Sequence, residues 1–377
     1  MDNTVIVIGG GISGLTAAGM LAQQGLDVTL LEKENETGGH LARWDRLFPD
    51  RKKASEVLDF AMEGLNKVKI VTGVAITGIS RQDHEFTVST NLRDSGYGMQ
   101  DAGYQSPVPS PQSPVPSTQS PVPSPQSQYT ASALLVATGF DLFEARKKEE
   151  YGYGIYNNVI TSADLEEQFK SGRKVLTSEG KTPGRIGFIH CVGSRDEKVG
   201  NLYCSKICCV TGVKQAIELK EMFPESEVFN FYMDLRMFDR HFEELYYEAQ
   251  QKWGVSFIRG RLSECSENPD GSIILKTEDT LTGKPLKMTV DLLVLLSGFV
   301  PSGGTRGISK MLGLQEGTDG FINSADQHSQ NNLSGIEGVF LAGAIKGPIS
   351  VSESVADARA AAAQIACYLS SFKVTND

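Results

Sequence analysis

The sequence predicts an α/β protein in which one domain of parallel sheet is interrupted by a second. The first apolar run, TVIVI, has the composition of a strand buried on both faces; a glycine-rich turn, a helical pattern ending at Gly25 and the strand DVTLLEK follow it. A second apolar strand, RIGFIH at 185–190, opens a similar unit, and the chain ends in a strand, a glycine-rich loop and an Ala-rich helix. We therefore expect the chain ends, residues 1–155 and 290–377, to form one domain and residues 156–289 the inserted domain.

The remaining elements follow from the same periodicities. Further strands are expected at 68–76 and 85–90, as a hairpin or small meander, and at 133–140, 255–259, 272–276 and 291–299, with helices at 208–223 and 237–252.

Composition and charge exclude several classes of protein. The net charge of −10 over 377 residues disfavours a nucleic-acid or anionic-membrane surface, since either would attract a basic face. No segment reaches the roughly 18 apolar residues of a membrane span, and the start, MDNTVIVIGGG, lacks the basic region of a signal peptide. We expect a cytoplasmic location, in which the six cysteines serve as metal ligands or buried thiols rather than disulfides.

Residues 105–127 differ in kind from the rest of the chain. They form a seven-residue repeat, QSPVPSP, that holds eight of the fifteen prolines. Proline removes backbone donors and fixes φ, so neither a helix nor a central strand can form there. We expect a disordered, polyproline-like insertion without a role in the core, although a Pro-rich ligand motif is an alternative.

A dinucleotide-binding fingerprint lies at the N-terminus. Gly9-x-Gly11-x-x-Gly14 follows a buried strand and opens a helix, and Glu32 comes at the end of the next strand. Gly9 permits the tight turn, Gly11 lets the backbone approach a pyrophosphate, and Gly14 allows close helix–strand packing. Glu32 can accept hydrogen bonds from ribose hydroxyls. Strand, turn, helix and acid together predict a dinucleotide site.

Three further segments resemble flavoproteins with two dinucleotide-binding domains, the thioredoxin- and glutathione-reductase-like class. They are Gly38-Gly39-His40 after the acidic strand, ALLVATG in the middle of the chain, and LAGAIKGPISVSESVADA near its end. The resemblance implies FAD. It places cofactor contacts at Gly9, Gly11, Ile12, Ser13, Gly14, Glu32, Lys33, Gly39, His40, Val74, Ala137, Thr138, Gly139, Gly343, Ala344, Ser350 and Val351.

Two side chains are candidates for tuning the flavin, although no catalytic acid, base or nucleophile is evident. His40 and Lys346 could act by charge or by hydrogen bonding, or could be a packing histidine and a solvated lysine. The final helix would direct its N-terminus at the flavin edge where negative charge develops on reduction. Ala344 stands where this class usually has an aspartate that holds the ribityl chain, which puts that contact in doubt.

Four of the six cysteines cluster in the inserted domain, at the place where a nicotinamide fingerprint would be expected. RIGFIH is followed not by GxGxxG but by the spacing Cys191-x12-Cys204-x3-Cys208-Cys209. Soft thiolates select zinc or iron–sulfur clusters, and the CxxC knuckle of zinc sites is absent. A 4Fe–4S cluster is the favoured interpretation, with zinc and non-ligating thiols as alternatives. The isolated Cys265 and Cys367 are expected to be buried structural thiols.

The segment CVGSRDEKVGNLYCSKICC, together with the FAD motifs, resembles the HdrA family, the flavin-containing chain of heterodisulfide reductase and its relatives. In that family the four matching cysteines hold an iron–sulfur cluster beside a thioredoxin-reductase-like FAD domain. Extra ferredoxin-type cysteine motifs are absent, and LFPDRKKASE stands where many relatives have cysteines. The chain thus resembles the short members found in quinone-interacting or sulfur-oxidising complexes.

The resemblance implies an oxidoreductase component that relays electrons between FAD, a 4Fe–4S cluster and partner redox subunits. The expected partners are other iron–sulfur or flavin subunits. A quinone-linked membrane protein is a further candidate partner, which would bring the chain to the inner membrane. A homodimer is also left open. One alternative is a stand-alone FAD-dependent pyridine-nucleotide or disulfide oxidoreductase, which would need a redox CxxC or a second fingerprint. Another is a scaffold that binds FAD without turnover.

Overall fold

The first domain is built on a parallel five-stranded sheet. The computed structural model describes residues 3–92 and 126–374. The sheet has the order β20-β9-β1-β2-β5. Its strands are β1 (Thr4–Ile8), β2 (Asp27–Leu31), β5 (Val68–Val71), β9 (Ala133–Val136) and β20 (Val339–Leu341). All but the partly exposed β5 are mostly buried, as their continuous apolar runs predicted.

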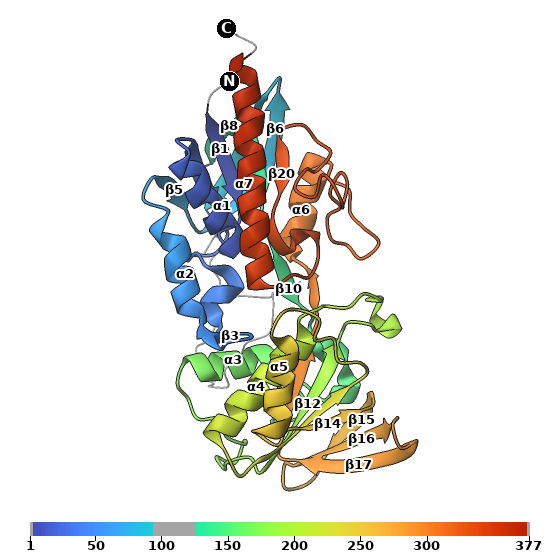
Figure 1. Cartoon of the computed structure of the whole chain (residues 1–377). Helices are drawn as coiled ribbons and strands as arrows, with labels where there is room; N and C mark the ends of the chain where they lie inside the picture. Colours follow the sequence, from blue (N-terminus) through green and yellow to red (C-terminus); the bar gives the residue numbers. More distant parts are fainter. Residues whose placement is uncertain (1–2, 93–125, 375–377) are drawn as a thin grey trace, which may run out of the picture.

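Two layers cover the two faces of this sheet. On one face α1 (Ile12–Gln23) packs against the long C-terminal helix α7 (Val351–Val374). On the other face lies an antiparallel meander of β6 (Val74–Gln82), β7 (Glu85–Leu92) and β8 (Ser127–Ala131), joined by α6 (Gly303–Leu312). Figure 1 shows α7 running the length of this domain beside α1.

The second domain repeats this plan. Its parallel sheet has the order β11-β18-β12-β13-β14, and a second meander, β15-β16-β17, covers one face. The strands are β11 (Val159–Thr161), β12 (Arg185–Val192), β13 (Glu227–Tyr232), β14 (Ser256–Arg259), β15 (Leu262–Glu267), β16 (Ile273–Asp279), β17 (Lys284–Val290) and β18 (Leu292–Ser297).

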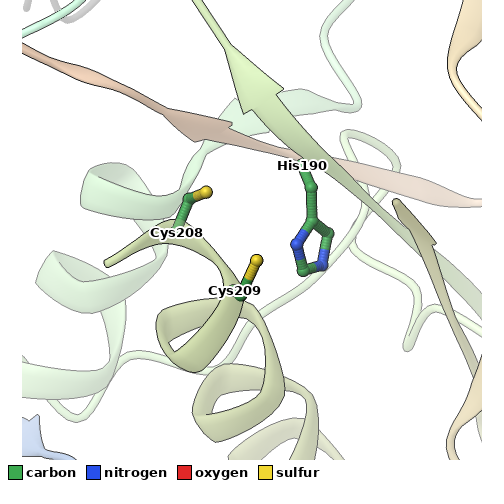
Figure 2. Close-up of side chains that lie close together, drawn as sticks. All are labelled: His190, Cys208 and Cys209. Atoms are coloured by element: carbon green, nitrogen blue, oxygen red, sulfur yellow. The ribbon is translucent and has the colours of Figure 1, made fainter. Parts of the chain in front are cut away.

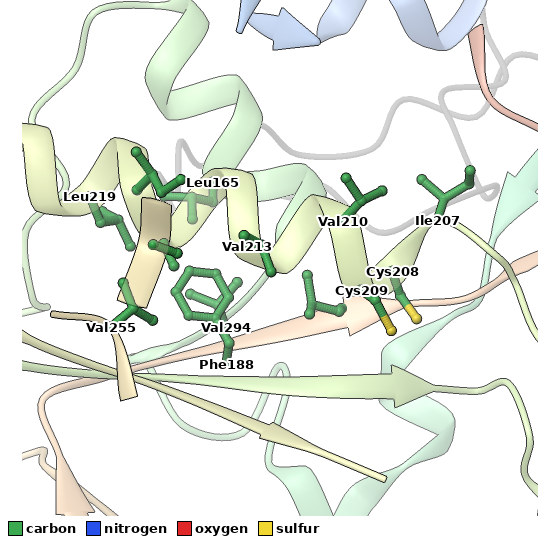
Figure 3. Close-up of a cluster of buried hydrophobic side chains, with 14 of the residues drawn as sticks. Leu165, Phe188, Ile207, Cys208, Cys209, Val210, Val213, Leu219, Val255 and Val294 are labelled. Carbon is green, nitrogen blue, oxygen red and sulfur yellow. The ribbon is translucent and has the colours of Figure 1, made fainter. Parts of the chain in front are cut away.

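Three helices cover the opposite face of the second sheet. They are α3 (Ser162–Lys170), α4 (Cys208–Met222) and α5 (Phe242–Gln251). Figure 3 shows the core beneath them, with Phe188 and Val294 from the sheet meeting Val213 and Leu219 from α4. The cysteine pair at the start of α4 lies at one end of this core.

A two-stranded antiparallel ribbon joins the domains. It pairs β10 (Phe140–Leu142) with β19 (Phe299–Pro301). Both predicted boundaries are therefore wrong: residues 143–151 pack in the core of the second domain, and β18 belongs to its sheet rather than to the segment 290–377. Either parallel sheet can accommodate a buried apolar strand, so the sequence of β18 did not reveal to which domain the strand belongs.

The segment between β2 and α2 (Ala54–Glu63) reaches across to the second domain. It carries the short 3₁₀ helix Gly39–Arg43 and the pair β3 (Arg46–Leu47) and β4 (Lys52–Lys53). Arg51 bonds Glu248 of α5 at 3.2 Å, and the amine of Lys214 in α4 donates to the Arg46 carbonyl at 2.9 Å. These contacts hold the two domains together near the cysteines.

Two connecting segments were also subjects of prediction. The run 68–76 does not form one strand of a hairpin, because Gly73 at φ +67 breaks it into β5, which joins the parallel sheet, and β6. The Pro-rich insertion lies outside the described residues except for its last two positions.

No helix within the described ranges is long and apolar enough to cross a membrane.

Candidate cofactor sites

The glycine-rich turn has the shape that a pyrophosphate requires. Three residues connect β1 to α1, and the helix begins without a side-chain cap, so its first N–H groups are free to bind an anion. A side chain at Gly9, whose φ is +108, would collide with the Ala137 carbonyl, and one at Gly14 would collide with the Gly9 carbonyl. A Cβ at Gly11 would meet no atom within 4 Å. Gly9 and Gly14 therefore allow close packing of the backbone, whereas Gly11 leaves open space beside it.

Glu32 is held in place beside this turn. Its carboxylate accepts the Gly10 N–H at 2.5 Å and the Glu34 N–H at 2.8 Å, and its own carbonyl accepts the Val74 N–H at 3.1 Å. Lys33, the next predicted contact, is exposed and lies 3.7 Å from Glu34. The buried carboxylate retains lone pairs for ribose hydroxyls.

The predicted FAD positions from distant segments converge on the same turn. A Cβ at Gly39, at φ +56, would lie 3.2 Å from Gly11 Cα. Gly343, at φ +79, packs against the Ser13 side chain at the start of α1. Thr138 and Gly139 follow the carboxyl end of β9, next to β1, and Ile12 is the first residue of α1. The carboxyl ends of parallel strands are where α/β sheets bind ligands.

His40 is a packing residue at the join between the domains. Its ring stacks on Phe140 with 4.4 Å between centroids, and its Nε2 lies 2.9 Å from the Phe140 carbonyl oxygen. Burial lowers the pKa of His40, against the opposing effect of that hydrogen bond. Phe140 stacks in turn on Phe299, the partner strand of the ribbon. A role in tuning the flavin stays a prediction.

Lys346 is not solvated. Its amine bonds Asp357 of α7 at 2.7 Å and the Asn331 carbonyl at 2.9 Å, and burial lowers its pKa against the pull of that carboxylate. Asp357, which the sequence patterns did not single out, also accepts the Gly343 N–H at 2.7 Å. A carboxylate therefore does lie at this turn despite Ala344, but protein donors already occupy it.

The N-terminus of α7 carries a capping box. Ser350 Oγ accepts the Glu353 N–H at 3.2 Å, and the Glu353 carboxylate accepts the Ser350 N–H at 2.7 Å. Val351 begins the helix directly after Ser350.

The four clustered cysteines lie around one loop at the end of β12. Cys191 is the penultimate residue of that strand, residues 193–207 form the loop, and Cys208 and Cys209 open α4. Cys191 Sγ lies 3.8 Å from Cys208 Sγ, and Cys204 Sγ accepts the Lys206 N–H at 3.3 Å. Hydrogen bonding with the Cys208 sulfur lowers the pKa of Cys191 and of Cys209, which favours their thiolate form.

This arrangement fits a soft-metal group. Helix α4 has no side-chain cap, so its first N–H groups can stabilise negative charge on thiolates. Arg195, which adds positive charge beside Cys191, bonds Asp234 at 2.7 Å. Cys191, Arg195 and Lys206 all have positive φ, a strain that concentrates at functional sites. Neither Cys191 nor Cys204 belongs to the group of potential ligands whose atoms lie within 4.8 Å of one another, but each thiolate of a four-iron cluster binds a different iron rather than a common point.

His190 also belongs to this group of potential metal ligands, and the sequence patterns did not identify it. Its ring nitrogen and the sulfurs of Cys208 and Cys209 lie within 4.8 Å of one another, all buried (Figure 2). The ring fits against α4 only because residue 212 is glycine: a Cβ there would stand 2.9 Å from His190 Nε2. Glycine inside a helix costs about 1 kcal/mol relative to alanine. Adjacency to Cys191 was the available signal.

The cysteine loop also touches the first domain. Lys206 lies 2.8 Å from Glu353, the residue that caps α7. One ion pair thus connects the loop to the helix whose N-terminus is expected to face the flavin.

The two isolated cysteines differ from each other. Cys265 in β15 is buried, and burial raises its pKa to about 12, as a structural thiol requires. Cys367 is exposed on α7, so the prediction that it is buried is wrong. Its neighbours in the Ala-rich helix gave no clear amphipathic pattern from which to judge its face.

Comparison with known proteins agrees with this architecture. Residues 7–70 match the family model of the NAD(P)-binding Rossmann-like domain. The structure resembles thioredoxin reductase of T. acidophilum (TM-score 0.62, 16% identity, 98% of this chain and 100% of that one). It also resembles thioredoxin reductase of Lactococcus lactis (TM-score 0.61, 17% identity, 98% and 99%). The two-dinucleotide-binding-domain fold expected from sequence is confirmed.

Curated relatives are more informative about ancestry. The chain is 36% identical to an HdrA-type iron–sulfur subunit of CoB–CoM heterodisulfide reductase from Methanopyrus kandleri, over 99% of its own length and 65% of that protein. It is 32% identical to the HdrA-type subunit of the H₂:CoB-CoM heterodisulfide, ferredoxin reductase from Methanothermobacter marburgensis, over 97% and 64%. The chain thus spans just under two thirds of the length of these two relatives. Over nearly its whole length the chain is similar to the HdrA-type subunits of heterodisulfide reductases.

Proposed function

We propose that this chain binds FAD and one 4Fe–4S cluster and relays electrons between the flavin and redox centres in partner subunits of a heterodisulfide-reductase-like complex. The proposal rests on a difference between the two domains at one equivalent position of the fold. At the place where the first domain has a three-residue glycine turn, the second has a fifteen-residue loop with cysteines at both ends. Several relatives are named iron–sulfur subunits, which supports the same assignment.

The residues of the first domain would bind and orient FAD. The N–H groups at the start of α1 would hold the pyrophosphate over Gly11, and Glu32 would accept the ribose hydroxyls. The N-terminus of α7, ordered by the Ser350–Glu353 capping box, would face the flavin and favour negative charge there.

In the second domain Cys191, Cys204, Cys208 and Cys209 would hold the cluster. Burial excludes water from three of these thiols, and the start of α4 and Arg195 offset the negative charge of the thiolates. When bound, the flavin would exchange one or two electrons and the cluster one at a time, so that a two-electron reaction is coupled to a one-electron chain. The contact of Lys206 with Glu353 would fix the position of the two sites relative to each other.

Partners would be other iron–sulfur or flavin subunits. The cysteine pattern of this sequence resembles that of the short family members in quinone-linked or sulfur-oxidising complexes, which favours partners of that kind. Any association with a membrane would then come through a partner. Purification of the native complex under anaerobic conditions, followed by identification of the bound chains, tests this part.

Anaerobic titration with dithionite tests the cofactor assignment. Uptake of about three electrons per chain, two by FAD and one by the cluster, is the expected result. Two electrons with a flavin spectrum would indicate a stand-alone flavoprotein. No uptake would indicate a scaffold.

A further inference from the structure

His190 presents an unexplained polar atom to the proposed cluster. The residue lies in β12, one position before Cys191, and is 7% exposed. Nε2 is 2.8 Å from Asn230 Oδ1 on β13, whereas Nδ1 has no hydrogen-bond partner among the residues that the structure describes. Buried polar atoms are nearly always paired, so an unpaired one calls for a missing partner.

The unpaired nitrogen points toward the cysteines. In Figure 2 the ring nitrogen on the Cys209 side is the one attached to the carbon that joins the side chain, which is Nδ1. The ring contributes to the group whose ligand atoms lie within 4.8 Å of one another, together with Cys208 and Cys209.

The surrounding structure accommodates the ring in this position. A side chain at residue 212, in the second turn of α4, would crowd His190 Nε2 and the Leu296 side chain at 2.9 and 2.6 Å. The helix therefore leaves a gap next to its cysteine-bearing first turn, and the imidazole fills that gap. Asn230 anchors the far side of the ring, so the side chain has little freedom to turn away from the sulfurs.

We propose that His190 donates its Nδ1–H to the sulfur of Cys209 and thereby raises the reduction potential of the cluster. The inference rests on the proposed cluster and deepens it: His190 is not a ligand but tunes one. Hydrogen bonds to cluster sulfurs stabilise the more negative, reduced state, and are one of the means by which a protein sets the potential.

The proton on Nδ1 is compatible with the Asn230 contact. Asn230 Nδ2 also has no partner in the described structure. An amide turned end for end donates Nδ2–H to Nε2, which leaves the single proton of a neutral imidazole on Nδ1. The rotation gives Asn230 Nδ2 a hydrogen bond and leaves the Nδ1 proton free to be donated to the Cys209 sulfur.

Pulsed EPR of the reduced wild-type protein, labelled with ¹⁵N-histidine, tests the contact without any variant. A weak nitrogen coupling together with an exchangeable proton coupling is expected. A strong coupling typical of a directly bound nitrogen, or no histidine coupling in a protein that carries its cluster, would overturn this inference while leaving the cluster assignment intact. A wild-type protein without iron would overturn both.

A redox titration followed by EPR tests the consequence. His190→Leu should keep about four irons and shift the midpoint potential to more negative values, and His190→Gln, which retains an N–H donor, should restore part of the shift. The control His328→Leu removes an exposed histidine and should change nothing. An unchanged potential in an iron-replete His190→Leu protein would contradict the proposal.

Discussion

The two domains share one plan but differ at the same turn. In each domain the central strand of a parallel sheet, β1 or β12, leads into a helix, α1 or α4, and an antiparallel meander covers one face of the sheet. In the first domain Gly9–Gly11 closes the gap with open space above Gly11. In the second domain the longer loop, the end of β12 and the start of α4 together place thiols, a histidine and an arginine in that region. The helix N-terminus is therefore the constant feature, and the turn determines whether it can receive a phosphate or a sulfur ligand.

The largest effect should follow from filling the space above Gly11. Gly11 has an extended backbone and a Cβ there meets no protein atom, so Gly11→Val should fold normally yet lose nearly all FAD by blocking the pyrophosphate. Flavin absorbance per chain measures this. Gly307→Val, at another glycine with open surroundings in α6, is the matched control and should retain FAD. Full FAD in Gly11→Val would break the assignment of the first site.

A second effect concerns the missing fingerprint in the second domain. Because the loop at 193–207 takes the place of a glycine-rich turn, NADH and NADPH should reduce the flavin slowly or not at all. Stopped-flow absorbance at the flavin band, with dithionite as the positive control, measures the rate. Rapid stoichiometric bleaching by NADH would show that the two domains differ less than we infer.

The ion pair between the domains should matter for rate more than for stability. Lys206 and Glu353 are 33% and 40% exposed, so their pairing contributes at most about 1 kcal/mol. Lys206→Met should lower Tm by less than about 3 °C, retain both cofactors, and slow electron exchange between flavin and cluster after rapid mixing with dithionite. Lys181→Met, which breaks an exposed pair with Glu179 elsewhere, should leave that exchange unaltered. An unaltered exchange in Lys206→Met would remove the proposed role of this contact.

The smallest effect is expected from residues 105–127. Replacement of this repeat by a short Gly/Ser turn should leave Tm and FAD content unchanged, because its composition offers nothing to a core. Differential scanning calorimetry would detect a contribution if there is one, and a large loss of Tm would show that the repeat packs on the fold.

Sequence patterns predicted what depends on neighbours along the chain. The β1–α1–β2 unit and the start of α4 at Cys208 follow from apolar periodicity and glycine position, and both are present. Contacts between distant segments were not predictable in this way. Asn230 meets His190 across forty residues, and Asp357 reaches Gly343 from the second turn of α7, without any local pattern that marks either pair. The domain boundary failed for the same reason, since strand pairing alone assigns β18 to the second sheet.

Above all, we infer that the cysteine loop holds an iron–sulfur cluster where a nicotinamide would otherwise bind. Iron and sulfide analysis of anaerobically purified protein, combined with EPR after reduction, is the decisive measurement. We predict about four irons per chain, lost in Cys204→Ser and Cys208→Ser and retained in Cys265→Ser, whose thiol is buried in β15 away from the loop. Zinc in place of iron, or no metal under strictly anaerobic handling, would contradict this inference.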